Sequence, residues 1–177
     1  HTRWATHGVP SERNAHPHVS GSIAVVHNGI IENYETLRNE LTAQGYVFTS
    51  DTDTESIAHL IEATLKGEPD LFAAVQIACR RLVGAYAIAV IDHRQPGKVV
   101  VAREGSPLLL GVSDSGNYAA SDASALLQVT RNMVYLENGD IAELTATSVR
   151  ITRLDGTPAE RPIHVSQLSA AAVELGN

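Results

Sequence analysis

The sequence contains almost no cysteine. Cys79 is the only one among 177 residues, so no disulfide can form within the chain. Disulfides persist in oxidising compartments, and a chain without them fits a reducing one. The first residues, from His1 onward, carry no basic and apolar leader of the signal-peptide kind. We therefore expect a cytoplasmic protein.

Basic residues are scarce, and long apolar runs are absent. Lys and Arg number 13 against 20 Asp and Glu, for a formal net charge of −7. Nucleic-acid binding requires clustered Lys and Arg to neutralise phosphates, and the apolar runs fall far below the ~20 residues that cross a bilayer. The glycines stand singly and match neither the G-x-G-x-x-G nor the Walker phosphate loop. We expect no nucleic-acid role, no membrane role and no cofactor.

The composition that remains is that of one globular domain, with 44% hydrophobic and 19% charged residues. Apolar spacing predicts three helices, which begin near Asn33 as an N-cap, at a capping box formed by Thr52 and Glu55, and at Asp70. Short strands are predicted at residues 1–4, 23–27, 46–49, 85–91, 99–102, 108–112, 117–120, 133–136, 141–144 and 149–154, with a short helix at 122–129. Helices grouped between strands predict an α+β domain with antiparallel sheets.

Histidines are concentrated in one part of the sequence. Five of the eight lie within the first 27 residues, at positions 1, 7, 16, 18 and 27. His16 and His18 could bind a metal, but zinc needs three or four donors, and no Asp or Cys lies nearby in this segment. Hydrogen bonding inside an ordered loop is the interpretation that we favour.

Two short segments carry groups suited to binding an anion. Arg3 is suited to bidentate binding of a carboxylate, with Trp4 beside it to exclude water; an exposed arginine next to a buried aromatic is the alternative. Asn28 and Gly29 follow an apolar run, and a side-chain amide beside a bare glycine N–H is the equipment of an oxyanion hole. An Asn-Gly turn is the alternative there.

Asp53 and Cys79 each allow two interpretations. Asp53 lies in the first turn of a predicted helix, where a carboxylate stabilises the helix dipole or pairs with a ligand ammonium. Cys79 lies on the apolar face of a predicted helix, which favours a buried, inert thiol over a nucleophile.

Several motifs together resemble one family, the glutamine amidotransferase domains of the N-terminal-nucleophile hydrolase type. The matching segments are HTRWATHG at 1–8, NAHPH at 14–18, VHNGIIEN at 26–33, TDTE at 52–55, GAYAIAV at 84–90, GSPLLLG at 105–111 and LENGDIAEL at 136–144. The resemblance covers residues 1–163, and residues 164–177 are expected to be a linker. It implies a four-layer αββα sandwich, incomplete at the N-terminus.

The resemblance also implies a substrate, L-glutamine, and residues that hold its head group. Arg3 would bind the α-carboxylate. Asp53 would bind the α-ammonium, with help from the carbonyl of Gly29.

Further residues are implied to cover the substrate and to act during the reaction. Trp4, Thr6 and His7 would belong to a loop over the bound glutamine. The Asn28 side chain and the Gly29 N–H would stabilise the oxyanion, and no metal is implied.

The family's nucleophile is a cysteine at the mature N-terminus, whose own amino group acts as general base. This sequence begins at His1, and Cys79 matches no family position of that kind. We therefore expect a fragment that does not hydrolyse glutamine by itself. The parent enzyme would supply ammonia for making glucosamine 6-phosphate from fructose 6-phosphate, would carry a sugar-isomerase domain in the same polypeptide, and would act as a homodimer. A glutamine-binding or sensing module without catalysis is the alternative.

Overall fold

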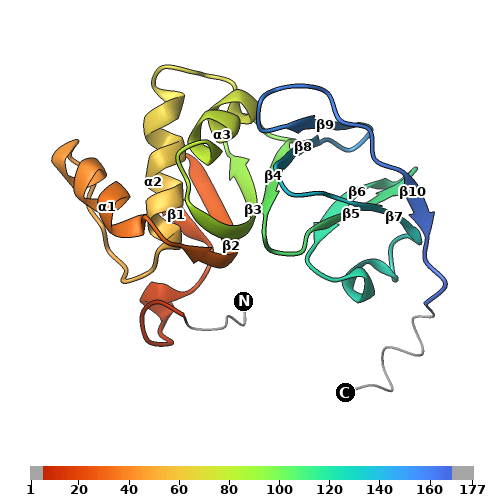
Figure 1. Cartoon of the computed structure of the whole chain (residues 1–177), viewed down its shortest axis with the longest axis horizontal. Helices are drawn as coiled ribbons and strands as arrows, with labels where there is room; N and C mark the ends of the chain where they lie inside the picture. Colours follow the sequence, from red (N-terminus) through yellow and green to blue (C-terminus); the bar gives the residue numbers. More distant parts are fainter. Residues whose placement is uncertain (1–5, 169–177) are drawn as a thin grey trace.

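The computed structural model describes residues 6–168, which form two antiparallel sheets with helices against the larger one (Figure 1). The larger sheet has the order β1-β2-β3-β4-β8-β9 and the smaller one β10-β7-β5-β6. The strands are β1 (His18–Ser20), β2 (Ile23–Ile31), β3 (Gly84–Asp92), β4 (Val99–Glu104), β5 (Leu109–Ser113), β6 (Gly116–Ala120), β7 (Asn132–Tyr135), β8 (Asp140–Leu144), β9 (Val149–Arg153) and β10 (Ile163–Val165). The helices are α1 (Tyr34–Ala43), α2 (Thr54–Leu65) and α3 (Leu71–Cys79), with 3₁₀ helices η1 (Glu12–Asn14) and η2 (Ala123–Leu126).

The alternating side chains of strand β3 separate two hydrophobic cores. Tyr86, Ile88 and Val90 pack into the core that lies between the larger sheet and the helices. Ala87 and Ala89 face the other way and pack into the core between the two sheets. Successive strand residues point to opposite faces, so large residues on one face contact helices while small ones admit a second sheet. The α+β prediction is confirmed.

A 3₁₀ helix covers the outer face of the smaller sheet within residues 6–168. Leu126 of η2 packs with Leu109 and Met133. Asp122 begins η2, as predicted for a short helix here, and its carboxylate accepts a hydrogen bond from the Ser124 N–H at 2.7 Å. The sandwich order of helices, sheet and sheet is therefore confirmed, with η2 as the outermost helical element that the structure describes.

On the face of the larger sheet opposite to the helices, an area over β1, β2 and the end of β3 is exposed in the described structure. Val19 on β1, Val26 on β2 and Ile91 on β3 lie on the face opposite to the helices and are 60%, 37% and 49% exposed. Asn28 lies on this same face of β2, since it is two residues beyond Val26. The candidate site therefore opens next to an apolar surface.

The capping box predicted for α2 is wrong, for a reason that affects the site. Asp53, not Thr52, occupies the N-cap position and makes no side-chain cap bond. The Glu55 carboxylate accepts hydrogen bonds from the backbone N–H groups of Thr49 and Ser50 at 2.8 and 2.7 Å. Because Glu55 binds these upstream amides, segment 46–49 is held as a loop and not as the strand that its alternation predicted.

Two other local predictions differ from the structure in detail. Asn33 does precede α1, but its side chain makes no cap bond. Its amide instead donates to the Arg81 carbonyl at 2.9 Å and accepts from the Val83 N–H at 3.0 Å. Strands β1 and β10 were not predicted, since three-residue strands carry almost no periodicity.

Glu55 is expected to make stability dependent on acid pH. Burial raises its pKa, but hydrogen bonds from Thr49 and Ser50 outweigh burial and hold it below 4.5. A carboxylate whose pKa is lower in the folded than in the unfolded chain stabilises the fold at any pH above its unfolded-state pKa. This stabilisation is lost as the pH falls through the folded-state pKa. Glu55→Gln should lower the free energy of unfolding at pH 7 by about 1.5–3 kcal/mol. It should also make the fall of that free energy below pH ~5, the acid limb of the stability curve, less steep.

Urea unfolding between pH 3 and 7 measures this effect. Glu12→Gln, at an exposed position, serves as the control and should leave the acid limb as in the wild type. An unchanged acid limb in Glu55→Gln would contradict the assignment.

Candidate active site

Strand β2 carries the predicted oxyanion residues in its interior. Asn28 pairs with Ala87 and Gly29 with Tyr86 in the antiparallel register with β3. The alternative of an Asn-Gly turn is therefore wrong. Gly29 has φ +128°, and a Cβ there would lie 2.1 Å from the Ala85 carbonyl oxygen. Only glycine fits this backbone conformation and this close approach.

Gly29→Ala is expected to cost about 2–4 kcal/mol of unfolding free energy, because it adds a backbone clash to a strained φ. Gly45 provides a matched control, since it has φ +92° but open space around its Cβ position. Gly45→Ala should cost only about 1–2 kcal/mol, the conformational part alone. Equal losses in urea unfolding would show that the contact with Ala85 does not matter.

Asp53 is buried, and each of its carboxylate oxygens has its own environment. Oδ2 accepts a hydrogen bond from the Ile31 N–H at 2.8 Å, which ties the start of α2 to the end of β2. Oδ1 lies 3.9 Å from His7 Nδ1, and Oδ2 lies 4.0 Å from His27 Nδ1. The carboxylate is thus fixed in place beside two imidazoles at 2% exposure.

The hydroxyl of Thr54 joins two histidines beside Asp53. Its Oγ1 lies 3.0 Å from His27 Nδ1 and 3.3 Å from His16 Nε2. Burial lowers the pKa of His27 below 6.5, although the Asp53 carboxylate acts in the opposite direction. His27 is therefore neutral at pH 7 and adds no positive charge to the site.

These groups line one cavity of about 310 Å³. Asn28, Gly29 and Asp53 share it, although they come from a strand and from the start of a helix. The complete lining is Thr6, His16, His27, Asn28, Gly29, Ile30, Asp53 and Thr54. Within residues 6–168 no hydrogen bond engages the Asn28 side-chain amide, so its donor is available to a bound molecule.

The predicted site residues do not all fall within the described part of the chain. Arg3 and Trp4 lie outside residues 6–168, so their predicted roles stay predictions. Thr6 lines the cavity. His7 does not line it, but its Nδ1 lies 3.9 Å from Asp53 Oδ1, and its ring is edge-on to that of Tyr34 with 4.8 Å between the ring centroids.

Cys79 and the pair His16 and His18 have structural contacts. Cys79 is buried in α3, and burial raises the pKa of its thiol to about 12, so it is not a nucleophile. His18 Nε2 lies 3.0 Å from the Thr52 hydroxyl. Among the described residues no three His, Cys, Asp or Glu side chains form a group suited to a metal.

Sequence reasoning missed Thr54 and His27 as lining residues. The residue pattern places Thr54 in a helix start and His27 at the end of an apolar run, and it predicts no site role for either. The signal that points to both is their position, because each directly adjoins a predicted site residue, Asp53 or Asn28.

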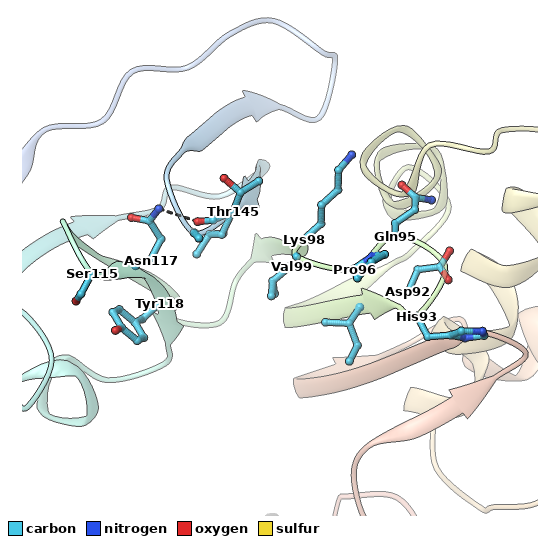
Figure 2. Close-up of a pocket in the computed structure, with 15 residues that line it drawn as sticks. Asp92, His93, Gln95, Pro96, Lys98, Val99, Ser115, Asn117, Tyr118 and Thr145 are labelled. Carbon is cyan, nitrogen blue, oxygen red and sulfur yellow. Dashed lines mark hydrogen bonds between the residues drawn. The ribbon is translucent and has the colours of Figure 1, made fainter.

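A larger cavity lies elsewhere, with a volume of about 510 Å³. Figure 2 shows Lys98 and Gln95 on one side of it and Tyr118 and Asn117 on the other. It lies where β3 ends and β4 begins, next to the turn between β5 and β6. None of the predicted site residues lines it, whereas Asn28, Gly29 and Asp53 line the smaller cavity.

The arrangement at Asn28 and Asp53 combines a fixed negative charge with neutral hydrogen-bond donors. A buried carboxylate favours a cationic group of a ligand. A side-chain amide that is not otherwise engaged favours an oxygen on which negative charge develops. A molecule with an ammonium and a reacting carbonyl fits both.

Comparisons with known proteins agree on one family. A model of the glutamine amidotransferase domain matches residues 1–128. The chain is 54% identical to the glutamine–fructose-6-phosphate aminotransferase (isomerizing) of Vibrio cholerae, over all of this chain and 29% of that protein. It is 59% identical to the protein of the same name from Acidithiobacillus ferridurans, over 99% of this chain and 29% of that protein.

Solved structures agree with the sequence comparisons. The glutamine phosphoribosylpyrophosphate amidotransferase of B. subtilis superposes with a TM-score of 0.70 at 28% identity, over 87% of this chain and 34% of that one. None of the helices in residues 6–168 is long and apolar enough to cross a bilayer. The chain spans less than a third of the length of its curated relatives. It belongs to the glutamine amidotransferase domain family, with the N-terminal-nucleophile hydrolase fold.

Proposed function

We propose that this chain is the glutaminase part of a glutamine–fructose-6-phosphate aminotransferase (isomerizing), and that its cavity binds L-glutamine. The observation that carries the proposal is the shared cavity of Asn28, Gly29 and Asp53. Ammonia released from glutamine would then serve to convert fructose 6-phosphate to glucosamine 6-phosphate, the reaction that the names of the relatives describe.

The head group of glutamine is bound through its two opposite charges. The Asp53 carboxylate binds the α-ammonium, with the Gly29 carbonyl as a further acceptor. The burial of Asp53 and its bond to the Ile31 N–H support this role, because both fix the carboxylate. Arg3 binds the α-carboxylate, and Trp4, Thr6 and His7 cover the bound molecule.

Hydrolysis of the side-chain amide proceeds through an oxyanion held by neutral donors. A cysteine thiolate attacks the amide carbon, and the Asn28 amide and the Gly29 N–H hold the resulting oxyanion. Collapse of this adduct, with a proton to the nitrogen, breaks the C–N bond and releases ammonia. Water then cleaves the thioester, and glutamate leaves. Cys79 cannot be this thiolate, since it is buried in α3 with a raised pKa, so the nucleophile must come from outside these 177 residues.

Glutamate release tests the proposal when a segment that carries an N-terminal cysteine precedes residue 1. We expect glutaminase activity in this longer polypeptide and none in the 177-residue chain. Activity of the 177-residue chain that survives Cys79→Ala would contradict the assignment of an external thiol.

A glutamine-binding module without catalysis is the second candidate, and the chain's own chemistry favours it in one respect. Its single thiol is buried, so bound glutamine would persist. Binding that Arg3→Ala abolishes, with no turnover in any longer polypeptide, would support this alternative over the first.

We propose the wider organisation on the same family grounds. The domain covers residues 1–163 and residues 164–177 lead, as a linker, toward a sugar-isomerase domain of the same polypeptide. The whole enzyme is a cytoplasmic homodimer. Light scattering of the full-length enzyme would measure its oligomeric state, and a monomer would contradict this part.

A further inference from the structure

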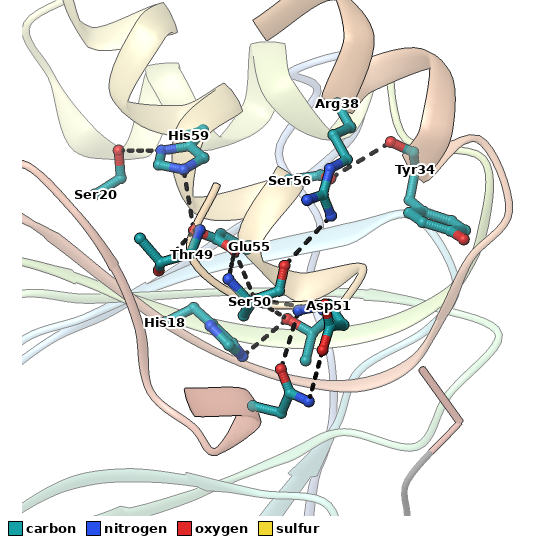
Figure 3. Close-up of polar contacts among 12 residues, drawn as sticks. His18, Ser20, Tyr34, Arg38, Thr49, Ser50, Asp51, Glu55, Ser56 and His59 are labelled. Carbon is teal, nitrogen blue, oxygen red and sulfur yellow. Dashed lines mark hydrogen bonds and ion pairs between the residues drawn. The ribbon is translucent and has the colours of Figure 1, made fainter. Parts of the chain in front are cut away.

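Residues 49–53, which we call the Asp53 loop, are bound to the rest of the domain on two sides. Glu55 of α2 accepts hydrogen bonds from Ser50, and Figure 3 shows their side chains together beside Asp51. His18 of β1 lies 3.0 Å from the Thr52 hydroxyl. These contacts come from the sheet and from α2, so the loop has little freedom to move.

A third contact joins the Asp53 loop to the segment of residues 6–13, which begins with Thr6 and His7. Asn14 directly follows that segment and is fully buried, with 0% exposure. Its Oδ1 accepts a hydrogen bond from the Asp51 N–H at 3.0 Å. Its Nδ2 donates to the Val9 carbonyl at 2.9 Å and to Asp51 Oδ2 at 3.4 Å.

The side-chain amide of Asn14 therefore makes three hydrogen bonds, one to the segment 6–13 and two to the Asp53 loop. Gly8 packs directly on it, since a Cβ at Gly8 would lie 2.5 Å from Asn14 Nδ2. Asn14 does not line the cavity. Its contacts thus act on the arrangement of the two segments and not on a bound molecule.

An asparagine is suited to this position because one of its two backbone partners is a hydrogen-bond donor and the other is an acceptor. The Asp51 N–H needs an acceptor, and the Val9 carbonyl needs a donor. A carboxylate would satisfy the first and repel the second, and it would also face the Asp51 carboxylate. A buried carbonyl that loses its donor is left with its desolvation cost uncompensated.

We propose that Asn14 is a positioning residue for glutamine binding, one that holds the covering segment 6–13 in register with Asp53. This inference rests on the proposed function. A segment that is already ordered loses less conformational freedom when it closes over a ligand, so affinity rises. Without the Asn14 amide, the segment loses its tie to the backbone of the Asp53 loop, and more of its ordering must take place at the moment of binding.

The test combines Asn14→Asp with two measurements on the 177-residue chain. The first is amide hydrogen exchange of residues 6–13 without ligand, and the second is calorimetric affinity for L-glutamine. We expect exchange to be at least about tenfold faster and affinity about tenfold weaker, the scale of one buried unsatisfied group. Combining Asn14→Asp with Asp51→Asn removes the repulsion between the two carboxylates but leaves the Val9 carbonyl without its donor, so it should recover part of the lost affinity.

Asn117→Asp is the matched control. The Asn117 amide also donates to a backbone carbonyl, that of Thr145 at 2.8 Å, but on β6 of the smaller sheet. It should lower unfolding stability without changing exchange of residues 6–13 or glutamine affinity. If the Asn14 and Asn117 variants behave alike in both measurements, or if the exchanged pair recovers nothing, the proposal is wrong.

Two milder variants decide the matter if Asn14→Asp does not fold. Asp51→Ala removes one of the two acceptors of Asn14 Nδ2, at a half-exposed position, and should speed exchange and weaken binding about threefold. Arg13→Gln removes only the exposed Arg13–Asp51 ion pair and should change neither. If the wild-type chain gives no heat with glutamine, the proposed function has failed, while hydrogen exchange still shows whether Asn14 orders the segment.

Discussion

Asn28→Ala is expected to lower glutamine turnover by about 10²–10³-fold, with a much smaller change in KM. Removing one donor of an oxyanion hole has an effect of this size, because the lost bond is strongest in the transition state. The Asn28 amide has no partner within residues 6–168 and lines the cavity, so its removal leaves the resting fold intact.

The measurement is glutamate release by a polypeptide in which a cysteine-bearing segment precedes residue 1. Asn132→Ala, at an exposed position of β7, is the control and should retain full turnover. An Asn28→Ala variant with unchanged turnover would rule out the oxyanion role, and one that raises only KM would indicate a binding role instead.

Asp53→Asn is expected to weaken glutamine binding by at least about 30-fold. Losing one partner of a desolvated charge pair typically costs 2–5 kcal/mol or more. Asparagine keeps an oxygen that accepts from the Ile31 N–H, which Asp53 Oδ2 now binds at 2.8 Å. The substitution thus removes the charge while it preserves the tie between α2 and β2.

Calorimetry with L-glutamine measures this loss. Asp92→Asn is a suitable control, because Asp92 is an equally buried carboxylate that pairs with Arg94 at the far end of β3. That variant should lose stability and keep its glutamine affinity. Unchanged affinity in Asp53→Asn, with the fold intact, would remove Asp53 from the site.

The sequence predicted well those features that depend on neighbouring residues. Asp70 begins α3, and its carboxylate accepts a hydrogen bond from the Ala73 N–H at 3.0 Å. Apolar spacing also located α1 and α2. Such caps and periodicities act within one or two turns, so the local pattern contains the information needed.

Features that depend on distant partners could not be predicted in the same way. Asn28-Gly29 looks locally like a turn, and only the pairing of β2 with β3 makes it part of a strand. Glu55 has the spacing of a capping box, but it binds the amides of the preceding loop. Tertiary contacts outweighed local preference in both cases.

The candidate site also combines features that the sequence predicts with features that depend on distant contacts. Residue chemistry and family motifs indicated Asn28, Gly29 and Asp53, and the structure brings all three to one cavity. The contacts of Thr54 with two histidines depend on how α2 packs against β2, which no spacing along the sequence specifies.

Calorimetric titration of the 177-residue chain with two compounds tests the central claim most directly. One is L-glutamine, and the other is 4-carbamoylbutanoate, which has the same carboxylate and amide but no α-amino group. Binding of glutamine, with the second compound at least about 30-fold weaker, is the result that a buried Asp53 carboxylate predicts. Equal affinity for both compounds, or no binding of glutamine, would contradict it.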